Sequence, residues 1–364
     1  MNIINTATRY PIGIDISDSA IKIIQLKKIK HKITIQAISR TDIPEGFVSQ
    51  GIIKKQHELG DIIKKSIEET IVGKITNREA IVCLPETKTF TKLITLKISD
   101  QKINDAILDE IEKNVPYRLK EVNYDWQIIN KNREKYQILV SVVPKKIAEN
   151  YYNTLKEAEL FPVVLEPEPL AITRALLPIN EKNKETTVII DIGTRHSNFI
   201  AYANGSILFT SSIPTSGDNI TKAISEKLKI SWSQAESAKI VCGLSQLHIK
   251  NVVEQELEQK IKKAFKYLSE NYSAYGSVTN IYLCGGGAYI KGLPEVLSKK
   301  LKIKTEIGHV FTNMNLSEKK ENLYFSKEFT TSKKLTVDNK VRKNFSLIFA
   351  TAIGLALRGV HYEI

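Results

Sequence analysis

One short pattern occurs twice in this chain, and this repeat constrains the fold more than any other feature. An apolar run that ends in an aspartate, a few small residues and a second β-rich run follow one another at residues 11–26 and again at 188–205. Superposing Asp15 on Asp191 also aligns the isoleucines that flank each aspartate. A single copy fits an ordinary hairpin turn, although a carboxylate at the tip of a buried strand must be paired, solvated or close to a metal ion. Two copies predict two related halves.

The composition is that of a globular protein with room for more than one domain. The chain has 364 residues, of which 42% are hydrophobic and 26% are charged, and this length suits two domains. Its net charge of +13 permits contact with nucleic acid or anionic lipid. Because the lysines are scattered and no basic stripe is interleaved with aromatic residues, we expect no specific nucleic-acid partner.

Cysteines and apolar segments bear on where the protein acts. No two of Cys83, Cys242 and Cys284 stand at metal-ligand spacing, which favours buried free thiols in a reducing cytoplasm. The N-terminus shows no signal peptide. The longest apolar stretch, residues 345–360, is shorter than the ~20 residues of a membrane-spanning helix, so we interpret it as a buried helix.

Hydrophobic periodicity predicts a β-β-β-α-β order in both halves. The first copy has strands within 9–43, a helix at 58–74 and a strand at 79–85; the second has strands within 186–213, a helix at 217–229 and a strand at 280–287. Residues between the copies follow a β-α-β-β-α pattern of their own. We divide the chain into a first half (1–86), an inserted α+β module (87–160), a connecting segment that returns to the first half (161–186), a second half with a helical part at 225–275 (187–340), and a C-terminal helix that packs back on the first half (341–364).

Three further features are unremarkable singly. Gly285, Gly286 and Gly287 follow a strand, where glycines let a ligand approach the backbone but are also common in loops. Glu166 and Glu168 stand between prolines before a helix, where acidic residues complement the helix dipole. Glu236 and Lys239 are three apart on one helical face, as in a surface ion pair.

Taken in order, these motifs resemble those of the actin-like ATPase superfamily. Two phosphate loops, an adenosine loop and two connecting helices would lie at residues 12–24, 188–202, 281–293, 166–176 and 350–358. The closer resemblance is to the PilM family of type IV pilus assembly proteins, relatives of the cell-division protein FtsA, and is carried by residues 110–129, 140–160, 190–224 and 281–301. It implies an α/β fold: an actin-like two-domain fold with duplicated RNase H-like β-β-β-α-β halves around a nucleotide cleft, plus the inserted module.

The resemblance also implies roles for particular residues. Asp15 and Asp191 would hold Mg²⁺ across the cleft, largely through water. Glu168 would orient the attacking water, with Glu166 as the second choice. The residues that would contact ATP are Ser17, Asp18, Ser19, Lys22, Gly193, Thr194, Gly217, Lys222, Glu236, Lys239, Gly285, Gly286 and Gly287.

Two positions depart from the family pattern. Ser17 and Ser216 stand where the family usually has glycine. If the native turn at Ser17 requires a positive φ, a Cβ there costs ~1 kcal/mol or more. The sequence therefore leaves open how tightly the nucleotide is bound and whether it is hydrolysed.

The resemblance implies a scaffold function and a partner. We expect an ATP-binding cytoplasmic scaffold that binds the N-terminal tail of a PilN-type inner-membrane protein in a groove between the inserted module and the first half. Membrane contact would then be indirect, and self-association is a further expectation. An FtsA-like division protein and a small-molecule kinase of the same superfamily are the alternatives. The sequence does not distinguish a pilus from a secretion or DNA-uptake system.

Overall fold

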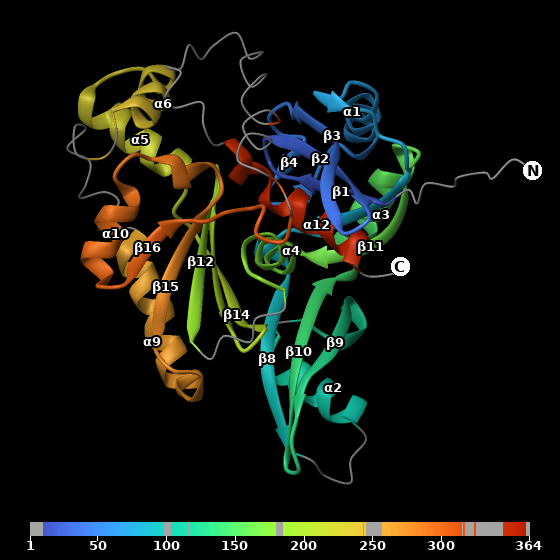
Figure 1. Ribbon diagram of the computed structural model, residues 1–364, viewed down its shortest axis with the longest axis vertical. Coiled ribbons are helices and arrows are strands. Elements are labelled where there is room, and N and C mark those ends of the chain that lie inside the picture. The colour runs from blue at the N-terminus through green and yellow to red at the C-terminus, as the bar shows by residue number, and fades with distance from the viewer. Residues whose placement is uncertain are drawn as a thin grey trace, which may run out of the picture.

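The protein consists of two α/β halves joined by central helices, with a smaller module at one end (Figure 1). The computed structural model describes residues 10–97, 103–115, 117–179, 185–242, 244, 257–314, 316, 324 and 345–361. A six-stranded sheet forms the first half, and an eight-stranded sheet runs through the second half and the module. Helices α4 (Glu168–Leu176) and α12 (Ala350–His361) lie between the halves and contribute to a core that both share.

The first half is a mixed sheet in the order β11-β7-β1-β2-β3-β6. Its antiparallel part contains β1 (Ile12–Ile16), β2 (Ala20–Ile29), β3 (Lys32–Asp42) and the short β6 (Val72–Gly73). Parallel to β1 on its other side follow β7 (Glu79–Leu84) and β11 (Phe161–Pro167). A two-stranded ribbon, β4 (Val48–Ser49) with β5 (Ile52–Ile53), precedes α1 (Gln56–Glu68).

Both faces of β1 are covered, which explains why this strand is apolar throughout. On one face its isoleucines pack with α1 and α3 (Lys145–Glu157). On the other face α12 crosses so closely that a Cβ on Gly13 would lie 2.3 Å from the carbonyl oxygen of Ala352. A Cβ on Gly354 would likewise lie 1.8 Å from the carbonyl oxygen of Ala171 in α4. Glycine at these two positions lets three backbones approach, because any side chain would force them apart.

The second half repeats this arrangement. Strands β12 (Thr186–Ile192), β13 (Ser197–Ala203) and β14 (Ser206–Ile213) form an antiparallel meander, while β15 (Val278–Cys284) and β16 (Lys304–Ile307) extend it in parallel. Its helices are α5 (Gly217–Leu228), α6 (Trp232–Val241), α9 (Gln259–Asn271) and α10 (Leu293–Leu301). Because β1 pairs with β2 and β7 as β12 pairs with β13 and β15, the predicted duplication is confirmed.

The inserted module extends the sheet of the second half. It contains β8 (Phe90–Lys97), α2 (Ile103–Asn114), β9 (Val122–Lys131) and β10 (Lys135–Pro144) around a small core of its own. Strand β14 pairs with β8 at Phe209 and Lys92, and the Thr210 hydroxyl donates to the Thr91 carbonyl at 3.5 Å. Short 3₁₀ turns complete the described elements at Glu86–Lys88, Leu119–Glu121, Ser273–Tyr275, Gly286–Tyr289 and Phe345–Phe349.

The predicted end of the module at residue 160 is wrong. Helix α3 belongs to the first half, because Tyr151 and Leu155 are fully buried in the core that β1 and α1 form. The Tyr151 hydroxyl also donates a hydrogen bond to the Gly51 carbonyl, at 3.0 Å. The module therefore ends with β10, at about residue 144.

Other expectations fare as follows. The C-terminal apolar stretch forms a buried helix as predicted, since ten residues of α12 are buried. Cys83 and Cys284 are buried free thiols and Cys242 is partly buried. No helix in the described ranges is long and apolar enough to cross a bilayer. The sequence pattern further predicts a helix start at Asp100, a helix end at Pro116 and an irregular surface stretch at 312–344. Asp100, Pro116 and most of that stretch lie outside the described residues.

Candidate functional site

A cavity of about 170 Å³ lies between the halves, where the strands of both sheets end. Eleven of the residues predicted from the sequence line it: Asp15, Ser17, Asp18, Ser19, Lys22, Glu168, Asp191, Gly193, Thr194, Gly285 and Gly286. Residues of α12 and the turn before it, including Thr351, close one side. The two segments that the resemblance identifies as phosphate loops therefore face the same space.

Asp15 lies at the end of β1 and is paired with a lysine from the next strand. The register places Asp15 opposite Lys22, and Lys22 Nζ lies 2.7 Å from Asp15 Oδ2. Burial lowers the pKa of Lys22, but the Asp15 carboxylate and the charge of Glu168 together raise it further, so that the pKa is raised overall. The Cys83 thiol donates a 3.6 Å hydrogen bond to the other carboxylate oxygen. Lys22 is therefore a permanent cation at the floor of the cleft.

Asp191 holds the equivalent position in the second half but lacks a lysine. The register places Asp191 opposite Asn198, whose amide nitrogen lies 3.5 Å from Asp191 Oδ2. Burial, and then the charge of Glu168, raise the pKa of Asp191 to about 7. A Cβ on Gly285, whose φ is +74°, would lie 2.4 Å from Asp191 Oδ1. Glycine is required at position 285 both by this backbone conformation and by the space that the carboxylate occupies.

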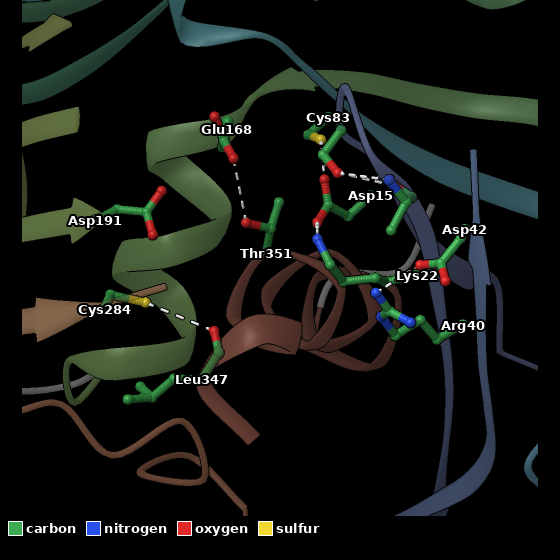
Figure 2. A network of polar contacts seen from close by, with 12 residues as sticks. Asp15, Lys22, Arg40, Asp42, Cys83, Glu168, Asp191, Cys284, Leu347 and Thr351 are labelled. Carbon is green, nitrogen blue, oxygen red and sulfur yellow. Dashed lines mark hydrogen bonds and ion pairs between the residues drawn. The ribbon is translucent and has the colours of Figure 1, made fainter. Parts of the chain in front are cut away.

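Glu168 begins α4 and completes a group of three carboxylates. Asn198 Nδ2 donates to Glu168 Oε2 at 3.1 Å, and the Thr351 hydroxyl donates to Oε1 at 3.5 Å. Burial, and then repulsion by Asp15, raise the pKa of Glu168 to about 7. Figure 2 shows Asp15 and Lys22 on the side of the first half and Asp191 on the side of the second. Glu168 is thus held in a fixed orientation between the aspartates.

The residues present fit a magnesium nucleotide. Asp15, Glu168 and Asp191 share the cleft, and burial, followed by repulsion between these carboxylates, raises the pKa of two of them. A divalent cation would relieve that repulsion. The Asn198 side-chain oxygen is buried without a hydrogen-bond partner among the described residues, so it leaves an acceptor for water or a cation. No three His, Cys, Asp or Glu side chains in the described ranges could together hold a metal ion. Mg²⁺ commonly uses one or two carboxylates, water and phosphate oxygens.

Neither serine that replaces a glycine strains its loop. Ser17 does not have a positive φ, and its hydroxyl donates to the Ala20 carbonyl at 2.9 Å and accepts from the Ala20 amide. Ser216 has a φ of −144° and caps α5 by accepting from the Asn219 amide. The cost considered for Ser17 is therefore absent.

Glu166 does not belong to the cleft. Its carboxylate is buried and accepts from both terminal nitrogens of Arg174, at 2.7 and 3.0 Å, and from Arg358 in α12. This ion triad connects β11, α4 and α12. Glu166, the second choice for the water-orienting residue, therefore lies outside the cavity lining.

Five other predicted contacts lie away from the cavity lining. Lys222 is exposed and 3.8 Å from Glu226. Lys239 is buried and binds the Gly217 carbonyl, the Thr221 hydroxyl and Glu236, so this pair joins α6 to the start of α5 rather than lying on the surface. Gly287 packs against Ile192. The Gly217 amide donates a hydrogen bond to the Gly193 carbonyl and so supports the second loop from outside the cavity lining.

The sequence-based prediction missed Asn198, Thr351 and Arg195. Asn198 could have been found, because it follows Asp191 by seven residues just as Lys22 follows Asp15. Arg195 lines the cleft from the second loop and lies 3.3 Å from Asp18. Thr351 comes from a helix far along the chain, and no local pattern places it beside Glu168.

A second, larger cavity of about 510 Å³ lies between the module and the first half. One wall is formed by β9 and β10, including Tyr124 and Trp126, and the other by β11 and α4. Arg174 and Arg358 of the ion triad lie at its base. Strand β9 ends the eight-stranded sheet and β11 ends the six-stranded sheet, so the groove runs between two sheet edges.

Known proteins resemble this chain in sequence and in fold. The sequence profile described as type IV pilus assembly protein PilM matches residues 13–360. A solved PilM–PilN type IV pilus biogenesis complex has 21% identity and a TM-score of 0.79, covering 97% of this chain and 99% of that one. MreB5 of Spiroplasma citri bound to AMPPNP has 17% identity and a TM-score of 0.51, covering 84% and 93%. FtsA of Enterococcus hirae is 23% identical over 363 residues, covering 83% of this chain and 81% of FtsA.

The duplicated halves, the central helices and the cleft between them define a protein with the actin-like fold. Within that class, the chain belongs to the PilM family of type IV pilus assembly proteins.

Proposed function

We propose that this protein is an ATP-binding scaffold of the type IV pilus inner-membrane platform, and that it binds the cytoplasmic N-terminal tail of a PilN-type membrane protein. The observation that carries the nucleotide part is the convergence of Asp15, Glu168 and Asp191, from three separate elements, on one cleft. Asp15 and Asp191 would hold the magnesium ion through water, and the amides of both loops would bind phosphate.

Turnover of ATP is slow in this proposal and depends on Glu168. A group that orients or deprotonates water must lie within hydrogen-bond reach of it. Glu168 is fixed by Asn198 and Thr351 in the cleft, whereas Glu166 is neutralised by two arginines outside it. Glu168→Gln should therefore lower phosphate release without a loss of MgATP affinity.

The groove between the module and the first half suits the partner's tail. An extended peptide can add to a sheet edge through backbone hydrogen bonds while its side chains fill apolar pockets. The groove offers two such edges, β9 and β11, and apolar side chains that include Tyr124, Trp126 and Leu170. The solved PilM–PilN complex, whose fold this chain shares, supports a PilN-type partner. Attachment through that tail would make the protein peripheral to the inner membrane, with indirect lipid contact.

The test is binding of the partner's N-terminal peptide to the full chain and to matched tyrosine variants. Tyr124 lines the groove and is 42% exposed, whereas Tyr117 is 40% exposed and lies outside its lining. Tyr124→Ser should weaken peptide binding measured by calorimetry, and Tyr117→Ser should not. Equal affinities for both variants and the wild type would place the tail elsewhere on the protein.

An FtsA-like division protein is the alternative in the same superfamily, and the FtsA relatives support it only distantly. Capture of the pilus protein's tail peptide distinguishes the two functions. A chain that binds MgATP but has no affinity for the pilus peptide would favour the FtsA-like function.

A further inference from the structure

We propose that Arg195 is a phosphate-binding residue of the cleft and that Asp18 holds it in place until a nucleotide phosphate competes for it. This role rests on the proposed nucleotide binding and adds to it a residue, together with its internal competitor. The two side chains come from opposite walls. Asp18 lies in the turn between β1 and β2, Arg195 in the turn between β12 and β13, and both line the cavity.

The contact between them is a direct connection between the two phosphate loops. Arg195 Nη1 lies 3.3 Å from Asp18 Oδ2, so the pair joins the first half to the second across the cavity. A phosphate group placed between the loops would meet the same guanidinium. Anion and carboxylate would then compete for one cation.

Asp18 does not depend on Arg195 for its own stabilisation. Its two oxygens accept hydrogen bonds from the backbone amides of Gln50 and Gly51, at 2.7 and 2.9 Å. Only about 5% of the side chain is exposed. When Arg195 leaves, both oxygens of Asp18 remain hydrogen-bonded, so the exchange leaves no bare carboxylate in the interior.

Arg195 is held more loosely than the other cations that line the cleft. Lys22 Nζ lies 2.7 Å from Asp15 and Arg40 Nη2 lies 2.6 Å from Asp42. The second contact of Arg195, at 3.9 Å, is with Glu45, whose side chain is 94% exposed, and an ion pair in that setting contributes little. A guanidinium presents a planar fork of N–H donors that matches phosphate geometry, and this one is 32% exposed.

The size of the cavity indicates when the exchange takes place. About 170 Å³ is below the roughly 300–1,000 Å³ of sites that enclose a small organic ligand. A nucleotide must therefore move the two loops apart, which lengthens the Asp18–Arg195 contact. Arg195 then turns from the carboxylate to the phosphates. If the ion pair only joined the two halves, its separation would have no further effect on the affinity for phosphate.

The two interpretations predict different signs for two single variants. As a phosphate ligand, Arg195→Gln should weaken binding of MgATP by roughly ten- to a hundredfold. Asp18→Asn removes a competing negative charge and should tighten binding by roughly a few fold. If the Asp18–Arg195 pair only joins the two halves, both variants break the same contact and should shift the affinity for MgATP in the same direction.

The experiment uses the full chain, purified free of nucleotide, and calorimetric titration with three probes: MgATP, magnesium tripolyphosphate and adenosine. Arg195→Gln should lose a similar factor for MgATP and tripolyphosphate and none for adenosine, and Arg195→Lys should recover part of the loss. Equal affinity of wild type and Arg195→Gln for both phosphate probes overturns the role of Arg195 while leaving the proposed function intact. A wild-type chain that binds neither phosphate probe removes both. Melting curves recorded without ligand identify a variant that has lost its fold. If Arg195→Gln does not fold, Arg195→Lys decides alone. Weakened tripolyphosphate binding by Arg195→Lys, with the wild-type affinity for adenosine, supports the role of Arg195, and unchanged tripolyphosphate binding overturns it.

Discussion

Glu86 is a carboxylic acid buried where the two halves meet, and it predicts a specific dependence of stability on pH. It lies in the 3₁₀ turn that packs against β14 and is 5% exposed. Burial raises the pKa of Glu86 to about 8, although hydrogen bonds with Thr210 and Thr89 oppose the rise. The folded protein therefore keeps a proton on Glu86 that the unfolded chain releases above its ordinary pKa of 4.5.

The size of the effect follows from this difference between the two states. Because the folded state binds more protons than the unfolded state, the contribution of Glu86 to stability is present at pH 4.5 and below and is lost as the pH rises toward 8. Each unit of pKa difference corresponds to about 1.4 kcal/mol. Between pH 5 and pH 8 the free energy of unfolding should therefore fall by roughly 3 to 4 kcal/mol through this group alone.

The assay compares urea unfolding of the wild type and Glu86→Gln at several pH values. Glutamine keeps the shape and cannot ionise, so the stability difference, wild type minus variant, should fall steadily from pH 5 to pH 8. Glu69→Gln is the matched control, because Glu69 is 70% exposed beside Lys65 and should leave the pH dependence unchanged. A difference between wild type and Glu86→Gln that stays constant over this range would refute the reasoning.

Three further outcomes are expected. Gly13→Ala should lower the unfolding free energy by about 1–3 kcal/mol or more, because the new Cβ would lie 2.3 Å from the α12 backbone. The control is Gly286→Ala, whose Cβ would meet nothing closer than 3.8 Å. Equal losses of stability in chemical denaturation would contradict the packing argument. Arg174→Ala should lower the free energy of unfolding by on the order of 3 kcal/mol, because the buried Glu166 then loses one of the two arginines that pair with it. The control Lys222→Ala, in an exposed ion pair, should change it by less than ~0.5 kcal/mol. A similarly small change in both variants would count against the triad. Glu168→Gln should slow phosphate release while MgATP binding persists, and an unchanged rate in a single-turnover assay would remove Glu168 from its role.

The sequence was sufficient to predict features that depend only on residues close together along the chain. The repeat around Asp15 and Asp191 predicted two related halves, since strand ends follow directly from a periodic pattern. The resemblance to actin-like proteins then implied that both aspartates face one cleft, and both line the same cavity. Helix α3 was predicted as a helix but assigned to the module. Periodicity shows which face of a helix is apolar but not which core that face enters, and here the core belongs to β1 and α1.

Contacts between segments that are far apart in the chain could not be predicted from the sequence. Glu166 and Glu168 look alike in one short motif, and only the fold brings Arg358 to the first and Thr351 to the second. Ser17 illustrates the same limit for the backbone, because the cost of its Cβ depends on a φ that the residue type does not determine. Lys222 and Lys239 were both assigned to the nucleotide, yet one faces solvent and the other is buried between α5 and α6.

The most direct test of the nucleotide cleft is the melting temperature of the nucleotide-free chain with and without millimolar MgATP, in the wild type and in Asp191→Ala. Binding to the folded state alone adds about 2.7 kcal/mol of stability at a hundredfold excess over Kd. We expect a clear upward shift for the wild type, a much smaller one for Asp191→Ala, and an undiminished one for the control Lys222→Ala. No shift in the wild type, or an equal shift in Asp191→Ala, would contradict the account.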